Sequence, residues 1–439
     1  MTHTKTVPGA GNGLNATVNV TGGIALNGCV QVQGSKNIAL HLYAAALLAD
    51  NPVVLDNAPD ILDTGVCARI LTATGTPARF DDGRLAITPA SILAPVIDAR
   101  LGRQVRTTAV LAAAVLARAG QASFPAPGGD AFCPRLIDRH LAAMRAAGAE
   151  ITSDGGLIRA VCARGRVHPF TVDVATPYGP SLGATVTAML LAARADGTSL
   201  ITSPSIEPEV TETARFLTER GVAIAFDSAG MHVAGNDRMG GGTFAVAADR
   251  IEAATLVMAA AATGGRIQLD GITTSAFPDG LRQVLDAAGV HLADEPTGLV
   301  ADVPGELQAV RTATGPHPGL PTDVAPQLAV LLTQAHGASA VDERVYPRRD
   351  THVAGLRRFG ADVNATGTTV HVRGPADLRA AHVEAGDIRA VTALLIAALA
   401  ARGSSTIAGM YHLRRGYGHL PAKLATLGAD ITIDDAEAA

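Results

Sequence analysis

Apolar and polar positions repeat along this chain in one recurring block. Each block contains Leu or Met, three further residues, a glycine, and then a short run in which apolar and polar positions alternate. The six glycines are Gly75, Gly148, Gly221, Gly289, Gly360 and Gly428, and successive copies lie 73, 73, 68, 71 and 68 residues apart. We expect each glycine to end a helix in left-handed backbone conformation, and the alternation after it predicts a strand.

An Ala- and Leu-rich segment precedes each copy and is apolar on nearly all sides. These segments cover residues 38–49, 107–119, 184–195, 253–262, 324–335 and 390–401. Helices without a polar face are buried, so these six predict the inner helices of the fold. Each repeat then reads strand–helix–strand–helix–strands. Six repeats exceed one core of ordinary size, which predicts two lobes of three repeats with helices inside and sheets outside.

Composition narrows the class of protein. The chain has 439 residues, of which 48% are hydrophobic and 17% charged, as is typical of a globular protein. Its net charge of −5 gives no electrostatic reason to bind nucleic acid. The four cysteines form no CxxC pair, which argues against a disulfide scaffold and a structural zinc site. No apolar signal region opens the chain, and its apolar stretches fall short of the ~20 residues that a membrane span needs, so we expect a cytoplasmic protein without a membrane or obligate protein partner.

Arginines gather where helices are expected to start. They are Arg106, Arg135, Arg250, Arg349, Arg389 and Arg415. A guanidinium at a helix N-terminus is electrostatically unfavourable for the helix, because the dipole is already positive there. Repetition of the pattern therefore indicates a site that collects positive charge for a small, multiply charged anion.

Three other side chains are candidates for chemistry. Lys36 is one of only three lysines and lies in GSKN, between an expected strand and an inner helix; the alternative is a solvated loop lysine. Asp130 follows Gly128-Gly129 and is a candidate general acid on a lid, or part of an ordinary Gly-Asp turn. Asp323 is a helix N-cap or, paired with such an acid, a candidate base.

Several longer segments resemble the enolpyruvyl transferases, and they occur in the family's order over nearly the whole chain. The segments are GSKNIALHLYAAALLADNPVVLDNAPDILDT, PGGDAFCPR, GPSLGAT, EPEV, ADRIEA, PHPGLPTDVAPQ, HVAGLRRFGAD, DIRA and YHLRRGYGHLPAKLATLGADI. Any one of them is weak, but together they are specific. The resemblance implies a two-lobed inside-out α/β barrel of six βαβαββ repeats, three per lobe, with the active site in the cleft. The lobes would comprise residues 35–247, and 1–34 with 248–439.

The resemblance also implies a reaction, addition–elimination between phosphoenolpyruvate and a nucleotide hydroxyl, with no metal or organic cofactor. It implies that Lys36, Arg135 and Arg415 hold phosphoenolpyruvate near Arg106 and Arg389, and that Asp130 is the general acid. Asn37 and Asp323 would contact the acceptor hydroxyl, with Asp323 as candidate base. The remaining substrate-binding residues would be Leu136, Ile137, Asp138, Arg139, Ser181, Leu182, Val345, Arg349 and Asp387.

This chain departs from the family pattern mainly on the acceptor side. Gly179-Pro180 precedes Ser181 where the family often has a basic residue, and Leu62 replaces another. Fewer cations suggest an acceptor with less phosphate. UDP-N-acetylglucosamine, through its 3-hydroxyl, remains the leading acceptor, and the alternative is the 3′-hydroxyl of UMP, as in nucleoside-antibiotic biosynthesis. A catalytically dead ligand-binding paralogue is a minor alternative.

Overall fold

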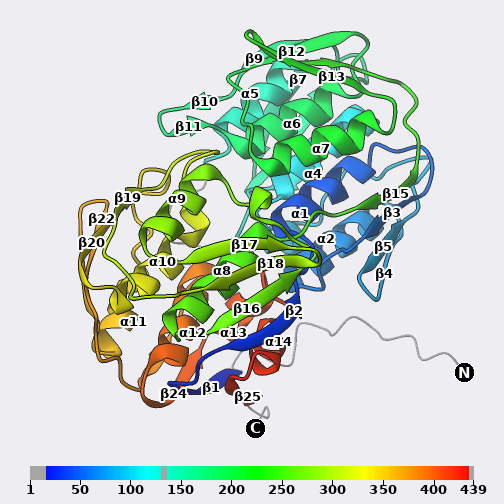
Figure 1. The fold of residues 1–439 in the computed structure, drawn as a ribbon. Helices are drawn as coiled ribbons and strands as arrows, with labels where there is room; N and C mark the ends of the chain where they lie inside the picture. Colours follow the sequence, from blue (N-terminus) through cyan, green and yellow to red (C-terminus); the bar gives the residue numbers. More distant parts are fainter. Residues whose placement is uncertain (1–15, 130–135, 435–439) are drawn as a thin grey trace, which may run out of the picture. The chain divides into compact units, whose positions relative to one another are not determined.

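The computed structural model describes residues 16–129 and 136–434, which form two compact units (Figure 1). The inserted unit comprises residues 34–247. The terminal unit comprises residues 16–33 together with 248–434. Each unit has its own hydrophobic core, and the chain passes from one to the other after Gln33 and again after Ala247.

The inserted unit surrounds three buried helices with three sheets. The buried helices are α1 (Lys36–Ala46), α4 (Thr108–Ala119) and α6 (Leu182–Ala192). The other helices are α2 (Leu62–Ala73), α3 (Ala99–Gly102), α5 (Asp138–Ala146) and α7 (Pro208–Thr218). The sheets have the strand orders β15-β3-β5-β4, β6-β8-β7 and β13-β14-β12-β9, and a short hairpin joins β10 to β11.

These strands have the following bounds: β3 (Val53–Asp56), β4 (Ala78–Asp81), β5 (Arg84–Ile87), β6 (Gln121–Pro125), β7 (Ala149–Asp154), β8 (Leu157–Cys162), β9 (Thr171–Asp173), β10 (Ala175–Thr176), β11 (Gly179–Pro180), β12 (Thr198–Thr202), β13 (Ala223–Asp227), β14 (Gly230–Ala234) and β15 (Gly242–Ala245).

The terminal unit repeats this plan around α8 (Arg250–Ala262), α10 (Ala325–Leu331) and α12 (Ile388–Ala400). Its other helices are α9 (Asp279–Ala287), α11 (Val353–Arg358), α13 (Met410–Arg414), α14 (Leu420–Thr426) and the 3₁₀ turns η1 (Thr274–Ala276), η2 (Thr322–Val324) and η3 (Leu332–Gln334). Its sheets have the orders β23-β24-β1-β25, β17-β18-β16-β2 and β19-β20-β22-β21.

The strands of the terminal unit are β1 (Thr17–Gly22), β2 (Asn27–Gln31), β16 (Arg266–Asp270), β17 (His291–Glu295), β18 (Gly298–Asp302), β19 (Arg311–Ala313), β20 (Gly337–Asp342), β21 (Asp362–Thr366), β22 (Thr369–Gly374), β23 (His382–Glu384), β24 (Gly403–Ala408) and β25 (Asp430–Asp434). The strand β1 pairs with both β24 and β25, so the start of the described chain completes its last sheet.

The repeat predicted from the glycine pattern is confirmed. All six glycines have left-handed backbone, with φ between 87° and 96°, and each follows a helix and precedes a strand. The six Ala-rich segments also form buried helices, because no polar face is present to meet water. Among the described residues, no helix combines the length and hydropathy that crossing a bilayer requires.

The helix-ending glycines yield a first prediction. Gly428 has φ 96°, and a Cβ at this position would meet no atom within 4 Å, so strain in the backbone is the only cost of a side chain. We expect Gly428→Ala to lower the free energy of unfolding by about 1–2 kcal/mol. Gly305→Ala is the control, because its added Cβ is equally uncrowded and its φ is not left-handed. If urea unfolding shows the same loss of free energy in both variants, the cost at Gly428 is not due to its left-handed backbone.

Two buried histidines yield a second prediction. Burial lowers the pKa of His41, on α1, to about 4, against a smaller opposing effect of Glu209. Burial likewise lowers the pKa of His352, before α11, to about 4, with Asp387 opposing and Arg349 reinforcing the shift. The unfolded chain binds protons at these histidines below about pH 6.5 and the folded chain does not. Stability should therefore fall as the pH drops from 6.5 toward 4.

The test compares the pH dependence of the thermal midpoint Tm in three proteins. We expect Tm to fall between pH 7 and pH 4.5 in the wild type, and to fall less in His352→Gln, since one linked proton is removed at up to about 1.4 kcal/mol per pH unit. Exposed His382→Gln should retain the wild-type dependence. A fall in His352→Gln as steep as in the wild type would show that this histidine is not the linked group.

Candidate functional site

The start of α1 holds the lysine singled out in the sequence. Lys36 is the first residue of this helix and only 8% exposed, so it is not a solvated loop side chain. Its Nζ lies 2.9 Å from Oδ2 of Asp63, which is also buried in the first turn of α2. Ser35 caps α1 by accepting a hydrogen bond from the amide of Ile38, and Asn37 follows Lys36 half-buried. The ammonium is thereby held at a helix N-terminus by a carboxylate from a second helix.

The starts of α4, α5 and α6 contribute further polar groups to the inserted unit. Arg106 is exposed just before α4. His140 on α5 forms a 2.7 Å hydrogen bond through Nδ1 with Oγ1 of Thr187 on α6. Burial lowers the pKa of His140 to about 3, and the charge of Arg106 adds to this effect, so the imidazole is neutral. Ser181 caps α6 by accepting from the amide of Ala184, and Leu182 is the first residue of that helix.

The predicted stretch between residues 135 and 139 is described only in part. Asp130 and Arg135 lie outside the described residues. Leu136 is 78% exposed, Ile137 is the N-cap of α5, and Asp138 is exposed. The Arg139 Nε lies 3.8 Å from Oδ2 of Asp138. In the inserted unit, polar side chains therefore lie at or directly before the starts of α1, α4, α5 and α6.

The terminal unit grips Asp323 between two arginines. Nη1 of Arg349 lies 2.7 Å from Oδ1, and Nη2 of Arg389 lies 2.6 Å from Oδ2. The arginine side chains are 5% and 11% exposed, whereas the aspartate is 23% exposed. Asp323 lies in the turn η2 and its side chain caps no helix, so the N-cap interpretation is wrong. Both carboxylate oxygens are instead engaged by guanidiniums, which form stronger hydrogen bonds than neutral donors.

Electrostatics decide the ionisation of this carboxyl. Burial opposes ionisation of Asp323, but the charges and hydrogen bonds of Arg389 and Arg349 outweigh it and hold its pKa well below the usual range. The effect is mutual: burial disfavours the Arg389 cation, but Asp323 raises the pKa of Arg389. The carboxylate is therefore charged at every working pH, and it accepts hydrogen bonds more readily than it binds a proton.

Arg389 is tied into a wider network at the start of α12. Its Nη1 donates to the hydroxyl of Tyr417 at 2.8 Å, and that hydroxyl lies 3.3 Å from Oγ1 of Thr255 on α8. Asp387 caps α12 by accepting from the amides of Arg389 and Ala390, and its other oxygen accepts from the Thr351 hydroxyl. Asp387, a predicted substrate-binding residue, therefore caps the end of the helix that carries Arg389.

Two of the arginines expected at helix starts do not lie in a first helical turn. Arg250 and Arg389 do lie in first helical turns. Arg415, however, ends the short helix α13 as its C-cap, because the chain turns at Gly416, and Arg349 lies four residues before α11. Both therefore lie a few residues before the helices expected near them, α11 and α14, and not in the first turns of those helices. Both are nevertheless buried.

Three further residues support these polar groups, although the sequence predicts no role for them. Asp63 pairs with Lys36 in the inserted unit. In the terminal unit, the buried hydroxyl of Tyr417 accepts from Arg389. Glu343 is 4% exposed and accepts from the amides of Val345 and Tyr346, each at 2.9 Å, and so fixes the loop of predicted residue Val345. The only sequence signal for Glu343 is its position directly after an apolar strand, where charged residues are common.

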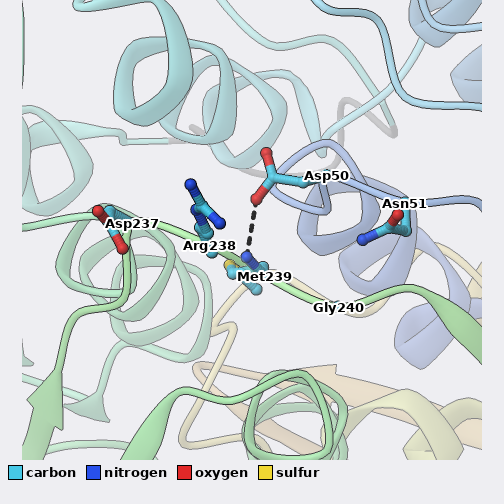
Figure 2. A pocket seen from close by; sticks show the side chains of 6 residues that line it. All are labelled: Asp50, Asn51, Asp237, Arg238, Met239 and Gly240. Atoms are coloured by element: carbon cyan, nitrogen blue, oxygen red, sulfur yellow. Dashed lines mark hydrogen bonds between the residues drawn. The ribbon is translucent and has the colours of Figure 1, made fainter.

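A polar pocket in the inserted unit lies away from these residues (Figure 2). It encloses about 500 Å³ and is lined by Asp50, Asn51 and residues 237–240. Asp50 follows the end of α1, and at ~1.5 Å per residue this 11-residue helix separates the pocket from Lys36. Asp50 accepts hydrogen bonds from Arg194 and from the amide of Met239, so its carboxylate has a structural role. Among the described residues, no cluster of three His, Cys, Asp or Glu side chains could hold a metal ion.

Comparison with known proteins connects this arrangement to a family. Residues 20–424 match the family of EPSP synthase (3-phosphoshikimate 1-carboxyvinyltransferase). UDP-N-acetylglucosamine 1-carboxyvinyltransferase 3 of Symbiobacterium thermophilum is 38% identical over 95% of this chain and 98% of its own length. The UDP-N-acetylglucosamine 1-carboxyvinyltransferase of Novosphingobium aromaticivorans is 37% identical over 94% and 97%.

Solved structures agree in fold. The enolpyruvyl transferase NikO from Streptomyces tendae superposes with a TM-score of 0.88 at 27% identity, covering 96% of this chain and 99% of that one. An EPSP synthase from Acinetobacter baumannii superposes with a TM-score of 0.76 at 16% identity over 96% and 100%, which bears on the fold alone. From the near-complete match and these relatives, this two-unit α/β chain belongs to the EPSP synthase family and is an enolpyruvyl transferase.

Proposed function

We propose that this enzyme transfers the enolpyruvyl group of phosphoenolpyruvate to a secondary hydroxyl of a uridine nucleotide and releases phosphate. The two named relatives above act, by their names, on UDP-N-acetylglucosamine, which makes its 3-hydroxyl the first candidate acceptor. We further infer that the three sheets of each unit are the outer layer of an inside-out α/β barrel, as the family resemblance implies.

The observation that carries the proposal is the cluster of buried cations in the terminal unit. Asp323, Arg349 and Arg389 together carry one net positive charge in a place largely shielded from water. Arg415 is buried in the same unit. Buried guanidiniums bind phosphate and carboxylate in pairs of parallel hydrogen bonds, which suits a donor that carries both groups. The family resemblance assigns Lys36 to the same donor, for which it would supply a compact ammonium.

The proposed reaction has two steps that balance. The acceptor oxygen attacks C2 of phosphoenolpyruvate while Asp130 gives its proton to C3, and the hydroxyl proton leaves toward Asp323. The resulting tetrahedral ketal still carries the phosphate. The bond between C2 and the phosphate oxygen then breaks, and the proton held by Asp323 passes to the departing phosphate. A proton of the C3 methyl group returns to Asp130, and the enol ether remains. Arg135 and the other cations stabilise the anionic groups throughout, as preorganised electrostatics require.

The two arginines that contact Asp323 bear on its proposed role. Two guanidiniums stabilise its negative charge, so a proton taken from the acceptor would be held weakly. We infer that Asp323 chiefly orients the hydroxyl by accepting its hydrogen bond, and takes the proton only as the C–O bond forms. Asn37 would hold the same hydroxyl from the inserted unit.

A second acceptor is favoured by a specific feature of the chain. Gly179-Pro180 stands before the α6 cap, where the family often has a basic residue, so one cation for a second phosphate is missing. UMP, with one phosphate, is the second candidate acceptor. Phosphate release from phosphoenolpyruvate, measured with UDP-N-acetylglucosamine and with UMP, decides between them. If neither nucleotide supports phosphate release, the result would favour a catalytically inactive ligand-binding paralogue.

Lys36 provides a third prediction, on the donor side. Lys36→Arg keeps a cation beside Asp63 and should keep Tm near the wild-type value. We expect kcat/KM for phosphoenolpyruvate to fall about 10²- to 10³-fold, because a planar guanidinium cannot replace a compact ammonium at one position. Arg84→Lys, at an exposed ion pair on β5, is the control and should change neither value. Wild-type kinetics in Lys36→Arg would remove this lysine from the site.

Asp130 provides a fourth prediction. A thiolate at the lid position would be alkylated by an epoxide of the fosfomycin type, whereas a carboxylate is a much weaker nucleophile. We expect the wild-type enzyme to resist time-dependent inactivation, and Asp130→Cys to become sensitive with a mass increase equal to the inhibitor. Time-dependent loss of wild-type activity with an adduct on the segment containing Asp130 and Cys133 would contradict this prediction.

A further inference from the structure

A two-stranded hairpin directly before α6 presents an exposed aromatic ring. The strands β10 and β11 pair through Ala175 with Pro180 and Thr176 with Gly179, and Pro177-Tyr178 forms the turn between them. Tyr178 is 57% exposed. Among the described phenylalanine and tyrosine side chains, only Tyr178 and Phe226 are exposed, and Phe226 lies on the separate strand β13.

The hairpin holds this ring on a rigid support. The hydroxyl of Thr176 donates to the carbonyl of Gly179 at 2.7 Å and accepts from the amide of Tyr178 at 3.2 Å. Pro177 restricts the turn further, and Gly179 supplies the left-handed backbone, with φ 108°, that closes it. The backbone that carries the ring is thus ordered before any ligand arrives, so little conformational entropy is lost when the ring makes contact.

The hairpin is fastened to the residues expected to bind the acceptor. The amide of Ser181 donates to the carbonyl of Val174 at 3.0 Å, so a backbone hydrogen bond joins the α6 cap to the base of the hairpin. Asp173, at the end of β9, accepts from the amide of Ala175 and from Thr202 on β12. The hydrogen bond from the amide of Ala175 is the largest of the effects that lower the pKa of Asp173.

The chemistry of the hairpin is that of a surface for an uncharged, flat group. Its six residues, 175–180, contain no charged side chain. The first turn of α6 also contains no acidic residue, so nothing there repels a phosphate. An aromatic face beside a helix N-terminus matches a nucleotide, in which a flat base is joined to an anion.

We propose that Tyr178 is a specificity-determining residue that stacks on the base of the acceptor nucleotide. This inference rests on the proposed function, because it assigns one part of the same acceptor. The hairpin thus replaces a contact to a second phosphate by a contact to the base, and it recognises the acceptor independently of the phosphoenolpyruvate site.

Kinetics test the inference in the intact enzyme. Tyr178→Ala should raise KM for the nucleotide about five- to twentyfold, the lower part of the range for a base on an aromatic ring, and leave KM for phosphoenolpyruvate unchanged. Tyr178→Phe should retain wild-type KM, because stacking needs the ring and not the hydroxyl. Phe226→Ala is the matched control, since it removes an exposed ring of the same unit away from the hairpin.

A direct binding measurement does not depend on turnover. The chain contains no tryptophan, so Tyr178→Trp introduces a single fluorophore at the proposed contact. UMP should quench this fluorescence at saturation, whereas ribose 5-phosphate, which lacks the base, should not. Phe226→Trp should respond to neither ligand.

The outcomes separate this inference from the proposed function. If the wild type releases phosphate with a nucleotide and Tyr178→Ala has wild-type KM, the role of Tyr178 is overturned and the function stands. If UMP quenches Tyr178→Trp but no nucleotide supports phosphate release, the contact stands and the function is overturned. Equal quenching by UMP and ribose 5-phosphate would overturn base stacking.

Discussion

The grip of Arg349 and Arg389 on Asp323 is the interaction around which the terminal unit arranges its polar groups. Three charged side chains meet in a largely dry place, which is costly unless each is paired. Their pairing fixes a carboxylate and one surplus positive charge at the same spot. Such an arrangement can orient a hydroxyl and attract an anion together, as a group transfer between those two partners needs.

The inserted unit reaches a similar result through one lysine. Lys36 and Asp63 pair at the starts of two helices, so their opposite charges offset each other where the ammonium is buried. His140 stays neutral beside Arg106 and Thr187, so this histidine adds no charge to the start of α5. Both units therefore place their chemistry at helix ends and leave the apolar middle of each helix to the core.

The β10–β11 hairpin is a local departure from the repeated fold. The buried helices and their sheets recur in every repeat, since each needs the same glycine turn and the same apolar faces. Within the described part of the chain, a two-stranded hairpin directly before a buried helix occurs only at α6. A rigid turn of this kind costs the core nothing, because its residues are on the surface, and it changes which groups surround a ligand.

The sequence by itself determined the repeat, the six buried helices and the glycine at the end of each second helix. These follow from local rules: an all-apolar helix must be buried, and left-handed backbone favours glycine. Family motifs then indicated which side chains to consider. The partners of those side chains were decided only by tertiary structure. Lys36 and Asp63, or Asp323 and Arg389, are separated by 27 and 66 residues in the sequence, and only packing of different helices brings their charges within hydrogen-bond distance.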